Sequence, residues 1–411
     1  MKKSILTFML VLVGLLISCK RDLSPLEEVN YVRPLTLAEE QLVQSGRDFG
    51  LKLFAAISEA QPDTNLFISP LSVSMAFGMA LNGAEGETYE AIRNTLELDG
   101  LTREQINKNY RSLIQLLVSI DPQVIFENAN SIWYRQDFSV LPSFIENNQK
   151  YFQADVEALD FSLPSAVDII NGWVTQKTHH KITQILDVIP KEAVLYLINA
   201  IYFKALWQYQ FDKKYTAEQP FYITPARSIT CSMMKITAEL GYYQDEQVQV
   251  VDLPYGNGSF SMTALLPAND YALDDLITNL QQDEWNQYLQ SMQTKKGTVA
   301  LPKFTMEYFT GLKEILGSMG MAVAFSLDAD FSRINPDEQI FITRALHKTF
   351  VKTDEEGTEA AAVTVVEFSR TSVGEDVDFY VTFNRPFIFI IREKHSGTIL
   401  FIGKMVKPEW N

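Results

Sequence analysis

The sequence predicts an α+β protein in which helices come first and strands gather towards the end. Apolar residues from Leu42 to Ile57 recur at helical spacing, which predicts an amphipathic helix early in the chain. Later segments rich in β-branched and aromatic residues predict strands at Gln247–Leu253, Ser259–Leu266, Thr298–Phe304, Phe387–Ile391 and Ile399–Met405. Helices followed by strands, instead of regular alternation, are typical of the α+β class.

A second early helix carries its own start and stop signals. Ser69 is a favourable N-cap, Pro70 suits the first helical position, and Asn82-Gly83 marks the end. Between them, Leu71–Leu81 is apolar on nearly every face, which predicts a helix inside the protein. A further helix is expected over Thr102–Ser119.

The strongest internal strand signal is Val194–Leu206, whose aromatic and β-branched residues suit a central strand covered on both faces. A strand is also expected over Ile125–Arg135. The polar run Glu393–Gly397 separates the last two predicted strands and predicts a hairpin turn.

The composition allows a large core and disfavours nucleic acid as a partner. The 411 residues are 46% hydrophobic and carry a formal net charge of -16, so a phosphate-binding surface is not expected. From Leu37 onwards no linker or repeat interrupts the pattern, and we expect one domain over residues 37–411. Only two cysteines are present, which cannot build a disulfide framework, and Cys231 is expected to be a small buried hydrophobe.

The first residues have the pattern of an export signal. Lys2 and Lys3 precede the apolar run Ile5–Ile17, which ends just before Cys19. This resembles a bacterial lipoprotein signal, so residues 1–18 are expected to be removed and Cys19 to be lipidated. Residues 19–36 would then tether the domain at the bacterial envelope, on the periplasmic or the exposed side of the outer membrane. Ordinary secretion with an incidental cysteine is the alternative.

The most informative segment follows the predicted strand Thr349–Thr353. An acidic turn, Asp354–Glu356, leads into small and β-branched residues up to Val366. Small side chains are what a segment needs if it must later enter a closed sheet. Alternation along such a strand places Thr358, Ala360, Ala362 and Thr364 on one face and Glu359 on the other. A fixed strand or a surface loop is the alternative interpretation.

Four segments resemble motifs of the serpin family: Asn65–Ser72, Asn199–Trp207, His347–Ala362 and Phe383–Phe387. They correspond to the start of the family's buried helix, the third strand of its large sheet, its inhibitory hinge and the strand after its reactive loop. The resemblance covers essentially Leu37–Asn411. It implies three sheets, about nine helices and an exposed reactive-centre loop.

The resemblance also implies roles for particular residues. Ser69, Ser72, Asn199 and His347 match the polar cluster where the large sheet opens, and Trp207 matches the point where insertion begins. The implied hinge consists of Glu355, Glu356, Gly357, Thr358, Glu359, Ala360, Ala361, Ala362, Val363 and Thr364.

The implied function is inhibition of serine proteases by a suicide-substrate mechanism, with the protease cutting the loop and being trapped covalently as the hinge enters the sheet. The cut bond is expected at Arg370-Thr371, which suits trypsin-like enzymes, or at Thr371-Ser372, which suits elastase-like enzymes with shallow pockets. Cuts after Val366 or Phe368 are less favoured. Cysteine proteases could be additional targets, and a monomer is expected.

Two other functions remain open at this point: a serpin-fold binding module without inhibitory action, and a surface adhesion lipoprotein. An enzyme is not expected, because the sequence lacks the nucleophile-elbow, phosphate-loop and zinc-protease motifs. The adjacent pair His179-His180 would point apart on a helix, so no metal and no cofactor are expected.

Overall fold

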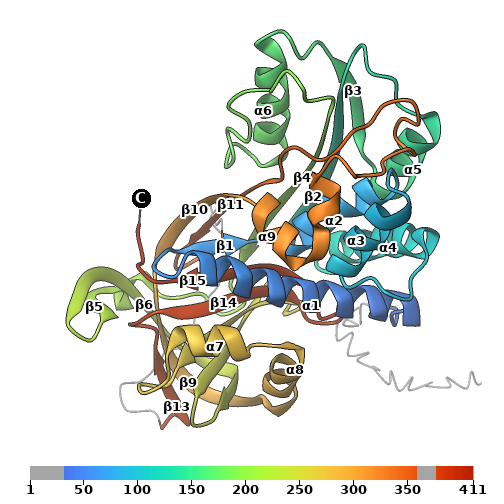
Figure 1. The fold of residues 1–411 in the computed structure, drawn as a ribbon. Helices are drawn as coiled ribbons and strands as arrows, with labels where there is room; N and C mark the ends of the chain where they lie inside the picture. The colour runs from blue at the N-terminus through green and yellow to red at the C-terminus, as the bar shows by residue number, and fades with distance from the viewer. Residues whose placement is uncertain (1–31, 359–375, 411) are drawn as a thin grey trace, which may run out of the picture. The chain divides into compact units, whose positions relative to one another are not determined.

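The computed structural model describes residues 32–358 and 376–410, and residues 35–411 form one compact unit (Figure 1). Its helices are α1 (Leu37–Ala60), α2 (Pro70–Leu81), α3 (Gly86–Thr95), α4 (Arg103–Ser119), α5 (Pro142–Phe152), α6 (Ser165–Lys177), α7 (Leu273–Asn279), α8 (Gln282–Ser291) and α9 (Lys313–Leu316). The nine helices of the described part agree with the number that the resemblance implied. None of them is long and apolar enough to cross a bilayer.

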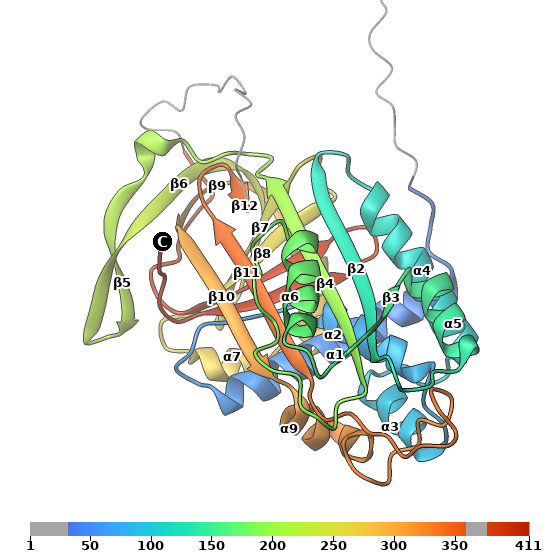
Figure 2. The same ribbon diagram turned by 90° about the horizontal axis from the view of Figure 1, so that it is seen from above.

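A six-stranded sheet forms one half of the unit. Its order is β10 (Phe304–Gly311), β11 (Leu346–Thr353), β12 (Gly357–Thr358), β4 (Leu195–Leu206), β2 (Val124–Arg135) and β3 (Asp155–Leu159). Helix α2 contacts β4 from one side, while α6 packs across the other face, over β4 and β2 (Figure 2). The predicted strand at Val194–Leu206 is therefore confirmed, with helices against both of its faces.

A nine-stranded sheet forms the other half. Its path is β1 (Leu66–Ile68), β15 (Ile399–Met405), β14 (Phe387–Glu393), β8 (Phe260–Pro267), β7 (Val248–Tyr255), β6 (Arg227–Gln244), β9 (Gln293–Pro302) and β13 (Phe379–Thr382), with β5 (Ala217–Thr224) beside β6. The resemblance implied three sheets, and the hydrogen bonds show why two of them merge here. Strand β6 is 18 residues long and pairs with β5, β7 and β9, so it joins two groups of strands.

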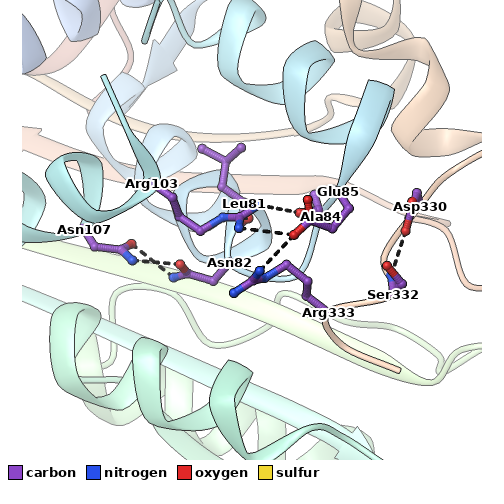
Figure 3. Close-up of polar contacts among 9 residues, drawn as sticks. All are labelled: Leu81, Asn82, Ala84, Glu85, Arg103, Asn107, Asp330, Ser332 and Arg333. Carbon is purple, nitrogen blue, oxygen red and sulfur yellow. Dashed lines mark hydrogen bonds and ion pairs between the residues drawn. The ribbon is translucent and has the colours of Figure 1, made fainter. Parts of the chain in front are cut away.

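The buried helix α2 is fixed at both ends. The Ser69 hydroxyl caps its start by accepting from the Ser72 N–H, as the sequence predicted. At its other end Asn82 exchanges two amide hydrogen bonds with Asn107, at 2.8 and 3.1 Å, and Arg103 donates to the carbonyl oxygens of Leu81 and Ala84 (Figure 3). Because carbonyls at and just after a helix end lack the regular helical donors, the guanidinium helps to satisfy them where the chain leaves α2.

Glu85 lies between two guanidinium groups beside this helix end. Its carboxylate pairs with Arg333 at 2.9 Å and Arg103 at 3.4 Å (Figure 3). The hydrogen bond from Arg333 holds the pKa of Glu85 below its ordinary value. Arg103 is thus part of the packing around α2.

Candidate functional site: an open sheet and its hinge

The central feature of the six-stranded sheet is a gap between β4 and β11. Within the part of the chain that the structure describes, these strands are not paired with each other, and only the two-residue strand β12 bridges them at one end. A cavity of about 410 Å³ lies farther along the gap, lined by Val73, Tyr196, Asn199, Ile342 and His347 among others. We call the gap between residues 195–204 and 346–352 the slot.

The two residues of β12 are seated tightly at the mouth of the slot. Thr358 is 2% exposed, and its hydroxyl lies 2.6 Å from the Tyr255 hydroxyl and 3.3 Å from that of Thr353. A Cβ atom on Gly357 would lie 2.1 Å from the Ala205 carbonyl oxygen, which is far inside contact distance. Only glycine fits where the hinge passes this close to β4.

The acidic turn Asp354–Glu356 is held to the end of β4 by Trp207. The Trp207 backbone N–H donates to the Glu356 carbonyl at 2.9 Å, and its indole N–H donates to the Asp354 carbonyl at 2.8 Å. The indole also stacks on the Tyr255 ring, with 4.4 Å between centroids. These contacts fix the segment from which any inserting strand would start.

Glu355 is the buried anchor of this turn. Its carboxylate is 5% exposed, pairs with the Lys303 ammonium at 3.0 Å and accepts from the Thr216 hydroxyl at 2.8 Å. Burial by itself would raise the pKa of Glu355, but the hydrogen bond from Lys303 and the other donors outweigh it and hold that pKa below its ordinary value. The neighbouring Glu356 instead pairs with Lys213 in a more exposed position.

A polar cluster lies beneath the slot. The Ser69 N–H donates to His347 Nε2 at 3.0 Å, and the Ser72 hydroxyl donates to the Asn199 carbonyl at 3.4 Å. Burial lowers the pKa of His347 to about 4, so the ring is neutral at physiological pH and can accept this bond. Residues from α2, β11 and β4 therefore meet here.

The side chain of Asn199 has one acceptor atom that is not used in a hydrogen bond. Its amide nitrogen donates to Asn128 at 2.6 Å and Asn130 at 2.8 Å, whereas its Oδ1 atom is buried and has no partner among the described residues. Asn199 and His347 line the same cavity from opposite sides of the slot. A buried acceptor without a donor costs free energy, so this position favours an incoming hydrogen-bond donor.

The structure separates the predicted site residues into two groups. Ser69, Ser72, Asn199 and His347 come together, whereas Trp207 lies beyond the other end of β4, about 26 Å away along an extended strand. Glu355, Glu356, Gly357 and Thr358 lie at the mouth of the slot. The remaining hinge residues Glu359–Thr364, the bonds at Arg370, Thr371 and Ser372, and Cys19 lie outside the described residues.

Other residues of the site were not predicted from the sequence: Tyr255, Thr216, Lys303 and Trp410. The sequence around each of them contains no motif that marks it as a site residue. Only the fold brings them to the hinge. The expectation that His179 and His180 lie on a helix is wrong, because α6 ends at Lys177 and both residues have positive φ, 48° and 64°, in the turn that follows. His179 Nε2 bonds to Glu127 at 2.9 Å. In the described ranges no group of three metal-ligating side chains is found.

Comparison with known proteins gives concordant results. The family model described as serpin (serine protease inhibitor) matches residues 44–408. Iripin-2 of Ixodes ricinus is 35% identical over 377 residues, covering 90% of this chain and 94% of that protein. The human leukocyte elastase inhibitor is 34% identical over 385 residues, covering 90% and 100%. The solved native structure of tengpin, a thermophilic serpin, superimposes with a TM-score of 0.82 at 32% identity, covering 92% of this chain and 96% of tengpin.

Proposed function

The chain belongs to the serpin family, and from this membership and the open slot we propose that it inhibits serine proteases as a suicide substrate. A protease would cut the loop after the hinge and form its acyl-enzyme. The hinge would then enter the slot as a new strand and carry the bound protease with it before water can release it. The protein itself performs no catalysis in this mechanism.

The slot between β4 and β11 is the observation that carries the proposal. Gly357 pairs with Leu206 and Thr358 with Ala205, so a strand continuing in this register would bring Thr364 to Asn199 and Phe368 to Leu195. The pairing of Thr358 with Thr353 likewise brings Thr364 beside His347. Thr364 would then supply a hydroxyl at the row where the Asn199 acceptor is unused.

The energy of such an insertion is of the required size. About ten new strand residues, at about 1 kcal/mol net per backbone hydrogen bond, give on the order of 10 kcal/mol. The stability of a whole protease domain is about 5 to 15 kcal/mol. Inserting the strand can therefore distort the active site of a trapped enzyme.

The proposed reactive bond is Arg370-Thr371, with Thr371-Ser372 as the alternative. Both bonds lie just beyond Phe368, which this register brings to Leu195, the first residue of β4, so either cut leaves enough chain to fill the slot. A cut after Val366 would leave the end of the slot empty. Trypsin-like enzymes fit the first bond and elastase-like enzymes the second. The same trap would act on cysteine proteases, which also pass through an acyl-enzyme.

Hydrogen exchange can follow the insertion directly. After the loop is cut by a protease that is not trapped, the β4 and β11 amides that face the slot should become strongly protected. Amides of β2 that already pair with β4 serve as the internal control, since their partners do not change. Unchanged exchange on both sides of the slot would rule out strand insertion.

We also propose that the protein is exported and anchored at the bacterial envelope through lipid on Cys19, as a monomer. The export and the lipid anchor rest on Lys2-Lys3, the apolar run to Ile17 and the position of Cys19. Cys19→Ser should then move the protein from the membrane fraction to the soluble fraction; retention in the membrane fraction would argue against the lipid anchor.

A further inference from the structure

Trp410 brings two lysines together beside the hinge. The Lys303 Nζ atom lies 4.2 Å from the centre of the Trp410 ring, and the Lys352 Nζ atom lies 4.6 Å from the same centre. Both distances are well within the range in which an ammonium group is attracted by an indole ring. Lys303 is also the partner of the buried Glu355 carboxylate.

The backbone next to Trp410 is held to β10, the edge strand of the six-stranded sheet, by one hydrogen bond. The Thr305 N–H, at the start of β10, donates to the Glu409 carbonyl at 2.7 Å. Trp410 is 40% exposed, so it contacts the two lysines at the surface without being part of the core. The hydrogen bond to Glu409 therefore helps to place the neighbouring Trp410.

These contacts form a chain from Trp410 to the hinge. Two ammonium groups that share one ring repel each other, and the ring together with Glu355 compensates for that repulsion. Lys352 belongs to β11, which forms one wall of the slot, and Lys303 links the ring to the acidic turn. Removing the ring would free Lys303 to turn towards solvent and leave Glu355 with a less firmly held partner.

We propose that Trp410 is a positioning residue that holds Lys303 against Glu355 and so fixes the acidic turn from which the inserting strand starts. Its effect on inhibition rests on the proposed function. A turn that is held less firmly starts insertion later, and a trapped protease then has more time to complete hydrolysis. Losing the ring therefore raises the fraction of inhibitor that is cut as an ordinary substrate.

The test compares Trp410→Leu, which removes the aromatic face, with Trp410→Phe, which keeps one. Trp410→Leu should reduce the equilibrium constant for folding by roughly threefold, as expected for a partly exposed cation–π contact. It should also raise the number of inhibitor molecules consumed per protease about twofold. Trp410→Phe should bring both quantities most of the way back to those of the natural chain. Equal effects of the two variants would contradict a role for the aromatic face.

A double-mutant cycle with Glu355→Gln tests whether Trp410 acts through the ion pair. The reduction in the equilibrium constant for folding caused by Trp410→Leu should be clearly smaller in the Glu355→Gln background than in the natural chain. Tyr151→Leu is the matched control, because Lys150 lies 4.8 Å from that ring on α5, away from the hinge, and its loss should be the same in both backgrounds. Additive losses for Trp410→Leu and Glu355→Gln would overturn the proposal.

Failure of the proposed function gives a different result. If the natural chain traps no protease, the number of inhibitor molecules consumed per protease cannot be defined for any variant. That result would contradict the proposed inhibitory function. The coupling between Trp410 and Glu355 in the folding equilibrium would still be present, because it needs no protease.

Discussion

Thr358→Arg is expected to convert the inhibitor into a substrate. Thr358 is almost completely buried between β11 and β4, with its hydroxyl against Tyr255 and Thr353. Thr358 already lies in the sheet as part of β12, so an arginine here would either bury an unpaired charge, which costs several kcal/mol, or displace β12 from between β11 and β4. In both cases the strand that must continue from Thr358 into the slot would lose its starting point. Insertion would be slowed far below deacylation, so the number of inhibitor molecules consumed per protease should rise more than tenfold.

The measurement is a titration of a fixed amount of protease with each variant, followed by gel analysis of cut and complexed chains. Thr358→Ser is the matched control, because it keeps the hydroxyl and adds no volume, and it should inhibit as the natural chain does. If Thr358→Arg inhibits with an unchanged stoichiometry, the strand from Thr358 does not enter the sheet.

Lys303→Met is expected to lower the free energy of unfolding at pH 7 by about 3 to 5 kcal/mol, because it leaves the Glu355 carboxylate buried without its cation. In the natural chain the pKa of Glu355 is lowered, so the carboxylate stabilises the fold above its unfolded pKa, and this contribution is lost as the pH falls through the folded pKa. Without Lys303 the donors that remain are the Thr216 hydroxyl and the backbone, so burial is less opposed and we expect the pKa of Glu355 to rise. The difference between variant and natural chain should therefore narrow as the pH is lowered below about 5.

Chemical denaturation at pH 7 and at pH 4.5 measures this difference. Lys352→Met is the matched control, since it removes the other lysine from the Trp410 ring but not the partner of Glu355. Lys352→Met should lower the free energy of unfolding by less than about 1 kcal/mol at either pH. Equal losses for the two lysine variants, or a loss from Lys303→Met that does not depend on pH, would show that Glu355 does not depend on this ion pair.

The sequence was most informative where local chemistry decides the structure. Ser69, Pro70 and Asn82 bound α2 as predicted, because caps and proline act within a few residues. The hairpin between β14 and β15 also forms at the predicted turn, where Gly397 adopts a positive φ of 77°. Both signals depend on neighbours along the chain.

Contacts made by the fold could not be predicted in the same way. Tyr255 reaches the hinge from the end of β7, Lys303 from the link between β9 and β10, and Trp410 from the chain beyond β15. Nothing in their own segments marks them. The merging of two sheets depends on the length of β6, whose pattern alone does not show its three partners. The unfilled slot is likewise a relation between β4 and β11, and not a property of either strand.

The central claim is most directly tested by incubating the protein with trypsin-like and elastase-like proteases and analysing the products under denaturing conditions. We expect a covalent complex that resists denaturant, together with a released C-terminal peptide. The mass of this peptide should show that it begins at Thr371 or, for the alternative bond, at Ser372. Cleavage in the loop without a complex for any protease of either class would contradict the inhibitory mechanism.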